Sequence, residues 1–164
     1  MPLFDYFRAA HHDQALEIAM RPGGPCGRES VAAHVDALAL RDLDPMVVMG
    51  KLLALVRGVE WSVDLYDLVA VWPTGPQPRA PQDFTEDSPW MTGPWVHDLG
   101  TAFRDWLADA DDSRLAEVSE KWQSIEELQG WGAPEWSLEV VESVVALARR
   151  AREAGESIYC WSCL

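Results

Sequence analysis

The chain has 164 residues, 48% of them apolar and 24% charged, which is typical of a globular protein and argues against global disorder. Its 27 acidic and 13 basic residues give a formal net charge of -14, which disfavours nucleic acid and anionic membranes as partners. Three cysteines indicate a reducing compartment, and the first residues lack the basic start and apolar run of a signal peptide. We expect a soluble cytoplasmic protein with a single globular domain over residues 1–164.

The first elements that the sequence predicts are short. Leu3–Ala9 has the aromatic content of a strand, and Asp13 is a suitable N-cap for a short helix over Gln14–Met20. Val35–Leu40 fits a short strand or a helical turn.

A central helix is the strongest prediction in the first half of the chain. Asp44 and Pro45 suit an N-cap and a first helical position, and Gly58 ends the apolar run. The helix is apolar on nearly all sides and should be buried. The next segment, Trp61–Trp72, fits both helical and strand spacing, and we favour a helix.

A proline-rich segment over residues 73–94 separates the two halves of the chain. It holds six of the 11 prolines, which remove backbone donors and bar the residues before them from helix. We expect a long ordered loop or a mobile lid, because structureless loops of this length are often functional.

Three amphipathic helices and a strand are predicted after this loop. Apolar residues recur every three to four positions over Pro94–Ala108, Asp112–Gln129 and Pro134–Ala154. Ser157–Leu164 then reads as a terminal strand. The fold class expected is α+β, predominantly helical, with four to six helices and a few short strands that include both terminal segments.

The chain resembles the YfbM-like family of small bacterial proteins in three stretches. Leu3-Phe4-Asp5-Tyr6-Phe7 looks like that family's opening strand, and Asp42–Gly58 is similar to its Asp-rich helix start and Leu-rich helix. The long C-terminal helix, its Ala-Gly break and the final apolar strand complete the order. The resemblance implies an α+β fold and no established activity, and the segment Trp72–Trp106 departs from the family pattern.

Two motifs contain candidate metal ligands. Cys160-Trp161-Ser162-Cys163 has the spacing of half a zinc site, but the sequence supplies no second half. His11-His12-Asp13 offers a general base with a carboxylate, although adjacent side chains point apart in most backbones. We interpret one of these cysteines as a small packing residue and the other as incidental, and the histidines as an exposed loop, and we predict no metal and no cofactor.

Clusters of carboxylates are the next candidates. Glu60, Asp64 and Asp67 share one face if their segment is helical, and paired carboxylates can hold a metal or divide acid and base roles. The alternative is a solvated face. Asp109, Asp111 and Asp112 lack the glycine and late glutamate of a calcium loop and are read as a polar turn between helices.

The negative charge is concentrated in residues 83–127, which hold 12 of the acids and 3 of the bases. Trp106 and Trp122 fall on apolar helix stripes, whereas four other tryptophans lie in loops or at helix starts and are candidates for exposed contacts. These four are Trp90, Trp95, Trp131 and Trp136.

The function favoured by these features is that of a non-enzymatic protein-binding module, like an immunity protein or inhibitor, that engages a basic partner. No nucleophile elbow or phosphate loop is present. The contact residues predicted for this module are Trp90, Trp95, Asp105, Asp109, Asp111 and Asp112.

The alternative is a small-molecule or metal-binding domain, which could be an enzyme, with a pocket near the 73–98 loop. Its candidate lining residues are Glu60, Asp64, His97 and Asp98, together with Trp90 and Trp95.

Overall fold

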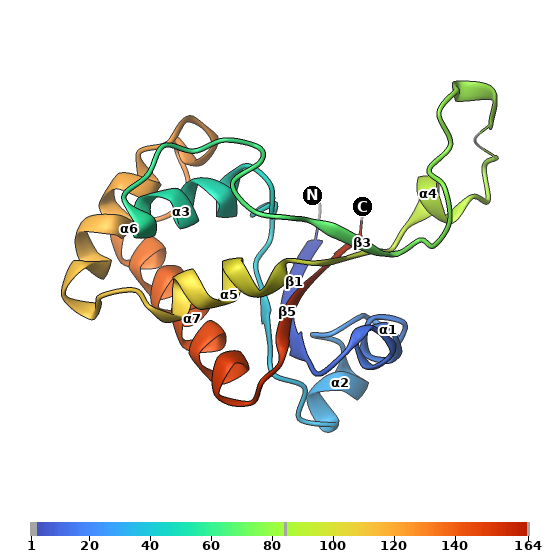
Figure 1. Ribbon diagram of the computed structural model, residues 1–164, viewed down its shortest axis with the longest axis horizontal. Helices are drawn as coiled ribbons and strands as arrows, with labels where there is room; N and C mark the ends of the chain where they lie inside the picture. The colour runs from blue at the N-terminus through green and yellow to red at the C-terminus, as the bar shows by residue number, and fades with distance from the viewer. Residues whose placement is uncertain (1–2, 84, 164) are drawn as a thin grey trace.

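The computed structural model describes residues 3–83 and 85–163, apart from the side chains of Pro81 and Pro134 (Figure 1). Seven α-helices and five strands occur in this part of the chain. The strands are β1 (Leu3–Ala9), β2 (Ala37–Ala39), β3 (Val69–Trp72), β4 (Trp95–Asp98) and β5 (Ser157–Cys163). The helices are α1 (His12–Ala19), α2 (Arg28–Ala32), α3 (Val48–Arg57), α4 (Pro89–Thr92), α5 (Gly100–Ala108), α6 (Leu115–Gln123) and α7 (Pro134–Glu153), with 3-10 turns η1 (Pro81–Asp83), η2 (Asp112–Arg114) and η3 (Glu126–Leu128).

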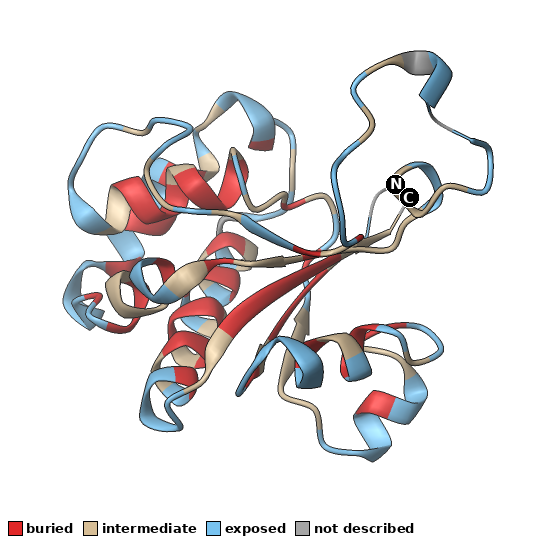
Figure 2. Cartoon of the chain, turned by 45° about the vertical axis from the view of Figure 1, so that its right-hand side comes forward, coloured by how far each residue is buried: buried red, intermediate tan, exposed pale blue. Residues whose placement is uncertain are grey.

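The five strands form one antiparallel sheet in the order β2-β1-β5-β4-β3. The two terminal strands pair along their whole length, with Leu3 opposite Cys163 and Ala9 opposite Ser157. The C-terminal strand therefore lies at the centre of the sheet, where Figure 2 shows its middle part buried. Strands β2 and β3 are left at the two edges.

Each face of the sheet supports its own core, because alternate side chains of a strand point to opposite faces. Tyr6, Ile158 and Cys160 pack against the larger layer of helices α3, α5, α6 and α7. Phe7, Tyr159 and Trp161 face the other way and pack with the residues of α1. Figure 1 shows these two groups of helices on opposite sides of the sheet.

The larger core is organised around α7, whose apolar stripe is fully buried at Val141, Leu147 and Ala148. Two polar groups inside it are satisfied by backbone carbonyls: the Trp122 indole donates to Val48 O at 2.9 Å and Tyr6 Oη donates to Leu43 O at 2.6 Å. Buried tryptophan and tyrosine pack best where such an acceptor is available.

The predicted α+β class is confirmed, with seven helices instead of four to six. The terminal strands are also confirmed, although Leu164, the last residue of the predicted C-terminal strand, lies outside the described residues. The segment Val35–Leu40 contains the strand β2 and not a helical turn. Among the described residues, no helix has the length and apolarity needed to cross a bilayer.

Several predicted boundaries were wrong. Trp61–Trp72 is not a helix: residues 58–68 form turns and a bend, and the strand β3 follows. Pro94–Ala108 begins with the strand β4, and only Gly100–Ala108 is helical. The segment Asp112–Gln129 is divided into η2, α6 and η3.

Two helix starts also differ from the prediction. His11, and not Asp13, is the N-cap of α1: its Nδ1 accepts a hydrogen bond from Gln14 N at 3.2 Å. Asp44 accepts hydrogen bonds from Val47 N and Val48 N, so it caps a turn that leads into α3 instead of starting the helix directly. Gly58 ends α3 in the left-handed region, as expected.

Candidate functional site

Two motifs that are 86 residues apart meet at the start of α1. His12 Nε2 lies 3.0 Å from Asp98 Oδ2, so the His11-His12-Asp13 motif and the end of β4 form one polar pair. The pair lies in an open cleft of about 460 Å³. The cleft is lined by Ala10, His11, His12, Asp13, Asp98, Ser157 and Tyr159.

The carboxylate of this pair is held in place by the backbone. Asp98 Oδ1 accepts a hydrogen bond from Gly100 N at 2.8 Å, while its other oxygen faces His12. The ring of Tyr159 packs edge-on against the His12 ring, with centroids 5.9 Å apart. Burial, followed by the charge of Asp98, raises the pKa of Tyr159 to about 12, so this phenol stays protonated at neutral pH.

This arrangement is chemically a histidine oriented by a carboxylate, which is the geometry of a general base. The His12 side chain is 52% exposed, so a ligand in the cleft can reach it. Among the described residues, no group of three or more His, Cys, Asp or Glu side chains is placed to hold a metal ion. The cleft therefore offers a polar binding site and a base.

Only one of the predicted pocket residues belongs to this cleft. His97 lies on the opposite face of β4 from Asp98, because it is paired with Cys160 of the larger core. Burial lowers the pKa of His97, which favours a neutral ring. Glu60 and Asp64 are exposed in the loop before β3, where no helix aligns them on a common face.

The predicted acidic contact residues gather at the end of α5 and the turn that follows it. Asp105 pairs with Arg104 at 2.7 Å, Asp109 with Arg152 at 2.5 Å and Asp112 with Arg149 at 2.8 Å. Asp111 accepts hydrogen bonds from Ser113 and is the N-cap of η2, as expected for a polar turn between helices.

Arg149 and Arg152 belong to the last turns of α7, so tertiary packing brings bases to this acidic segment. Arg149 also donates to Ala108 O and Ala110 O, which ties the turn to the helix. Three of the four predicted acidic contact residues, Asp105, Asp109 and Asp112, are therefore paired with arginines in the folded protein.

The predicted contact tryptophans lie on a different part of the molecule. Trp90 belongs to α4 and Trp95 opens β4, and both are half-buried. Residues 73–94 form an arm that projects from the strands β3 and β4 at the opposite end from α6 (Figure 1). Trp90 and Asp109 therefore cannot contact one small surface of a partner together.

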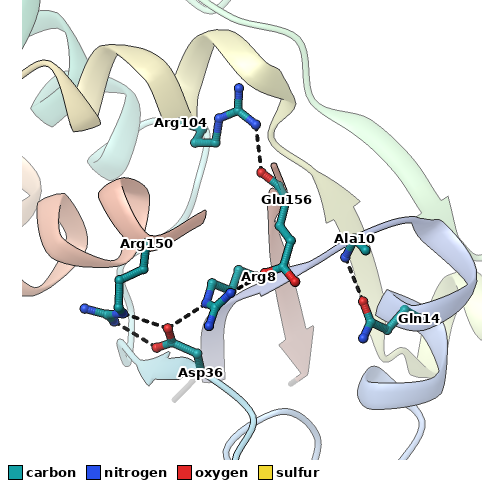
Figure 3. Close-up of polar contacts among 7 residues, drawn as sticks. All are labelled: Arg8, Ala10, Gln14, Asp36, Arg104, Arg150 and Glu156. Atoms are coloured by element: carbon teal, nitrogen blue, oxygen red, sulfur yellow. Dashed lines mark hydrogen bonds and ion pairs between the residues drawn. The ribbon is translucent and has the colours of Figure 1, made fainter. Parts of the chain in front are cut away.

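An ion-pair network joins elements from both ends of the chain (Figure 3). Arg8 of β1 contacts Asp36 at 2.7 Å and Glu156 at 2.5 Å, and Arg150 of α7 makes two bonds to the same Asp36 carboxylate. Arg104 of α5 donates to Glu156 O at 2.8 Å. Hydrogen bonding to Arg150, then Arg8, lowers the pKa of Asp36.

An apolar groove, which sequence reasoning missed, runs between the edge strand β2 and α7. It consists of two adjoining hollows of about 320 and 240 Å³ that share Ala39, Leu40, Trp136 and Val140. Two of the tryptophans predicted to make exposed contacts, Trp131 and Trp136, line it. The signal that could have found it is the position of both tryptophans at the start of a long helix.

The cysteines of the C-x-x-C motif point to opposite faces of the sheet. Cys160 is fully buried in the larger core, while Cys163, three positions along the same strand, packs against the smaller one. Residues three apart on a strand lie on opposite faces, so these two thiols cannot chelate one ion.

Most basic side chains already hold a carboxylate within the protein. The bases in such ion pairs are Arg8, Arg21, Lys51, Arg104, Lys121, Arg149, Arg150 and Arg152. In contrast, Glu135, Glu139 and Glu142 are exposed, and none of them forms an ion pair with another described residue. Their spacings of four and three residues place them along one side of α7.

No family model, curated protein or solved structure matches this chain at a significant level. The resemblance to the YfbM-like family stays an expectation from the sequence.

Proposed function

We propose that this chain is a non-enzymatic binding module that engages a basic protein partner. The observation that carries the proposal is that most Lys and Arg side chains form ion pairs within the protein. The charge that remains on the surface is therefore mainly acidic. Such a field raises the rate of encounter with a positively charged protein and selects against acidic ones.

The arm over residues 73–94 supports the same function. The hydrogen bonds of its described residues stay inside it, as in those from Met91 N and Thr92 N to Ser88 O. The arm presents Asp83, Glu86 and Asp87 to solvent, and Met91 is 52% exposed. An acidic projection with an exposed apolar side chain is suited to contact with another protein.

The proposal is tested by capture from bacterial extract with the purified protein as bait. Bound proteins are eluted with a salt gradient and identified by mass spectrometry, and each candidate is then purified and titrated calorimetrically at low and high salt. We expect one basic protein whose affinity falls steeply with salt. Retention of acidic proteins only, or affinity that does not change with salt, would contradict the proposal.

The matched control for this experiment uses charge variants. Asp83→Asn, Glu86→Gln and Asp87→Asn together remove three negative charges from the arm. Asp13→Asn, Glu29→Gln and Glu153→Gln together remove three exposed charges elsewhere. A purely non-specific attraction is weakened equally by both sets, whereas a contact that includes the arm is weakened more by the first.

A second candidate function is supported by the His12–Asp98 pair. We propose that the cleft of about 460 Å³ holds a small polar ligand through His12 and Asp98. Screening of polar metabolites by ligand-observed NMR tests it. A ligand that binds the unaltered protein and is lost in Asp98→Asn supports the site, and binding that persists in this variant overturns it.

A further inference from the structure

We propose that the basic partner binds as an extended segment that adds a strand to the outer edge of β2, with side chains in the groove and against the glutamates of α7. The inference rests on the proposed function and names where and in what conformation the partner is held. Three independent features converge at this place: an open sheet edge, an apolar groove and a row of unpaired carboxylates.

The edge of β2 presents backbone groups that the sheet does not use. Leu40 N donates to Phe4 O at 2.7 Å, and Arg8 N donates to Asp36 O at 3.3 Å. Because backbone groups of successive strand residues alternate between the two sides, Asp36, Leu38 and Leu40 face β1.

The N–H and C=O groups of Ala37 and Ala39 therefore point away from the sheet, where β2 has no strand neighbour. Ala39 is exposed, and its methyl group leaves room for a second backbone to approach. Unpaired edge groups of this kind are a template for strand addition.

The groove beside this edge supplies apolar contacts. Trp136 and Val140 of α7 form one wall, and Leu38 of β2 and Leu40, which follows that strand, form the other. The Trp136 ring is fixed from behind, since it stacks on buried Trp122 with centroids 6.2 Å apart. Because the Trp136 ring is already ordered, it can bind an aliphatic side chain without the entropic cost of ordering the ring.

The carboxylates adjoin the groove along α7. Each of the three glutamates comes directly before a residue that lines the groove: Glu135 before Trp136, Glu139 before Val140 and Glu142 before Ser143. Glu139 itself also lines the second hollow. The row is therefore parallel to the groove wall formed by Trp136, Val140 and Ser143. An occupant with a cationic side chain next to an aliphatic one would contact the glutamates with the first and the apolar groove with the second.

The chemistry of the occupant follows from strand geometry. Side chains of an added strand alternate between the two faces, so those toward α7 are two positions apart. We infer a segment in which aliphatic and Lys or Arg side chains alternate at every second residue, with β-forming residues between them.

The probe is a fluorescein-labelled peptide, Thr-Val-Thr-Arg-Thr-Val-Thr-Arg-Thr, which is titrated against the full chain by fluorescence anisotropy. We expect saturable binding that weakens with salt and strong protection of the β2 amides from hydrogen exchange. Replacing its Arg with Glu, or methylating alternate backbone nitrogens, should abolish binding. The methylated peptide keeps charge and side chains and loses only the strand hydrogen bonds.

The protein variants separate the two contacts. Ala39→Pro removes one outward N–H and should weaken binding about fivefold or more, which corresponds to one hydrogen bond. Glu135→Gln, Glu139→Gln and Glu142→Gln together should weaken it about tenfold and flatten the salt dependence. The matched control removes three exposed charges elsewhere, as Glu29→Gln, Glu60→Gln and Glu120→Gln.

Each outcome decides a specific claim. Equal effects of the two triple variants, or unchanged binding of the methylated peptide to the unaltered protein, would overturn the β2 site even if Ala39→Pro failed to fold. A dimer of the chain that Ala39→Pro dissociates in analytical ultracentrifugation would assign the edge to a second copy and overturn it too. If a captured basic partner binds Ala39→Pro unchanged, the β2 site fails while the proposed function stands. If no basic partner is captured, the proposed function fails.

Discussion

Asp36 connects two elements that are distant from it in the sequence. Its carboxylate accepts hydrogen bonds from Arg8 of β1 and from Arg150 of α7, so it fixes the start of β2 to both. Hydrogen bonds to charged groups contribute more than neutral ones because the low local dielectric strengthens them. This carboxylate therefore links the terminal strand, the edge strand and the long helix.

Asp36→Asn is expected to lower the free energy of unfolding by about 1–2 kcal/mol at pH 7, since Arg150 loses its carboxylate partner and Arg8 keeps only Glu156. The pKa of Asp36 is lowered in the folded state by Arg150 and Arg8. Its stabilising contribution is therefore present above the ordinary pKa of an aspartate and is lost as the pH falls through the lowered one. Urea unfolding at neutral and acid pH measures both effects.

The control for this prediction is Asp64→Asn, which alters an exposed carboxylate outside the network. Its unfolding free energy should stay within about 0.5 kcal/mol of the unaltered protein. A deficit in Asp36→Asn that persists undiminished at the lowest pH would show that the lost stability does not come from the charge of Asp36.

Gly132 is a position where the absence of a side chain allows close packing of the Trp136 ring. It has a φ of +57°, and a Cβ there would lie 3.1 Å from the Trp136 ring. Gly132→Ala should destabilise the protein by about 1–2 kcal/mol, from backbone strain and from displacement of the ring. Urea unfolding followed by tryptophan fluorescence gives the free energy and reports the altered ring environment.

Gly130→Ala is the matched control, because Gly130 also has a positive φ but a Cβ there meets nothing within 4 Å. This variant isolates the backbone strain. Equal losses of stability in the two variants would mean that close packing against Trp136 contributes nothing.

At the scale of elements, the arm over residues 73–94 is the part that the rest of the fold does not need. The residues of both cores lie outside it, apart from contacts at its base, and its polar contacts are internal. Its neighbours β3 and β4 are paired independently, with Val69 opposite Asp98. A long surface connection of this kind can be shortened at small entropic cost.

Replacing residues 75–92 with Asn-Gly should change the free energy of unfolding by less than about 1 kcal/mol, because no core side chain is removed. Chemical unfolding followed by circular dichroism measures it. The same variant should lose affinity for a captured basic partner if the arm is part of the contact. Loss of a cooperative transition would show instead that the arm holds β3 and β4 together.

Element boundaries in this region were the main error of sequence reasoning. Val96, Leu99, Phe103 and Leu107 have helical spacing, yet the first of them lies in β4 and only the last two lie in α5. All four are buried, but Val96 packs in the smaller core and the other three pack in the larger one, on the opposite face of the sheet. Periodicity reports burial, and it could not show that these residues belong to two elements that face different cores.

At the scale of the whole molecule, repulsion among unpaired carboxylates opposes folding. The net charge of -14 is the acidic excess that remains when every base is counted against an acid, and the described ion pairs are mostly on the surface, where each contributes little. Raising NaCl from low ionic strength to 0.5 M should therefore increase the melting temperature, because screening weakens the repulsion more than the pairs.

Differential scanning calorimetry across a NaCl series measures this effect. The triple variant Glu135→Gln, Glu139→Gln and Glu142→Gln serves as the reference, since it carries less charge and should gain less from salt. A melting temperature that falls with NaCl would mean that the ion pairs outweigh the repulsion.

The sequence by itself determined the α+β class, the terminal strands and the limits of α7, because these depend on local periodicity, capping and composition. Gly58 and Gly155 mark helix ends by a conformation that few other residues adopt. The burial of Trp122 followed in the same way from its place on an apolar stripe.

Only the tertiary structure decided which distant residues meet. His12 and Asp98 form a pair, Asp109 and Asp112 are neutralised by arginines of α7, and β2 and Trp136 border one groove. The sequence separations involved are long, and no local pattern encodes which strand lies beside which or which end of a helix a turn approaches. The composition gives the net charge. Which carboxylates form ion pairs depends on which arginines lie near them, and only the tertiary structure shows this.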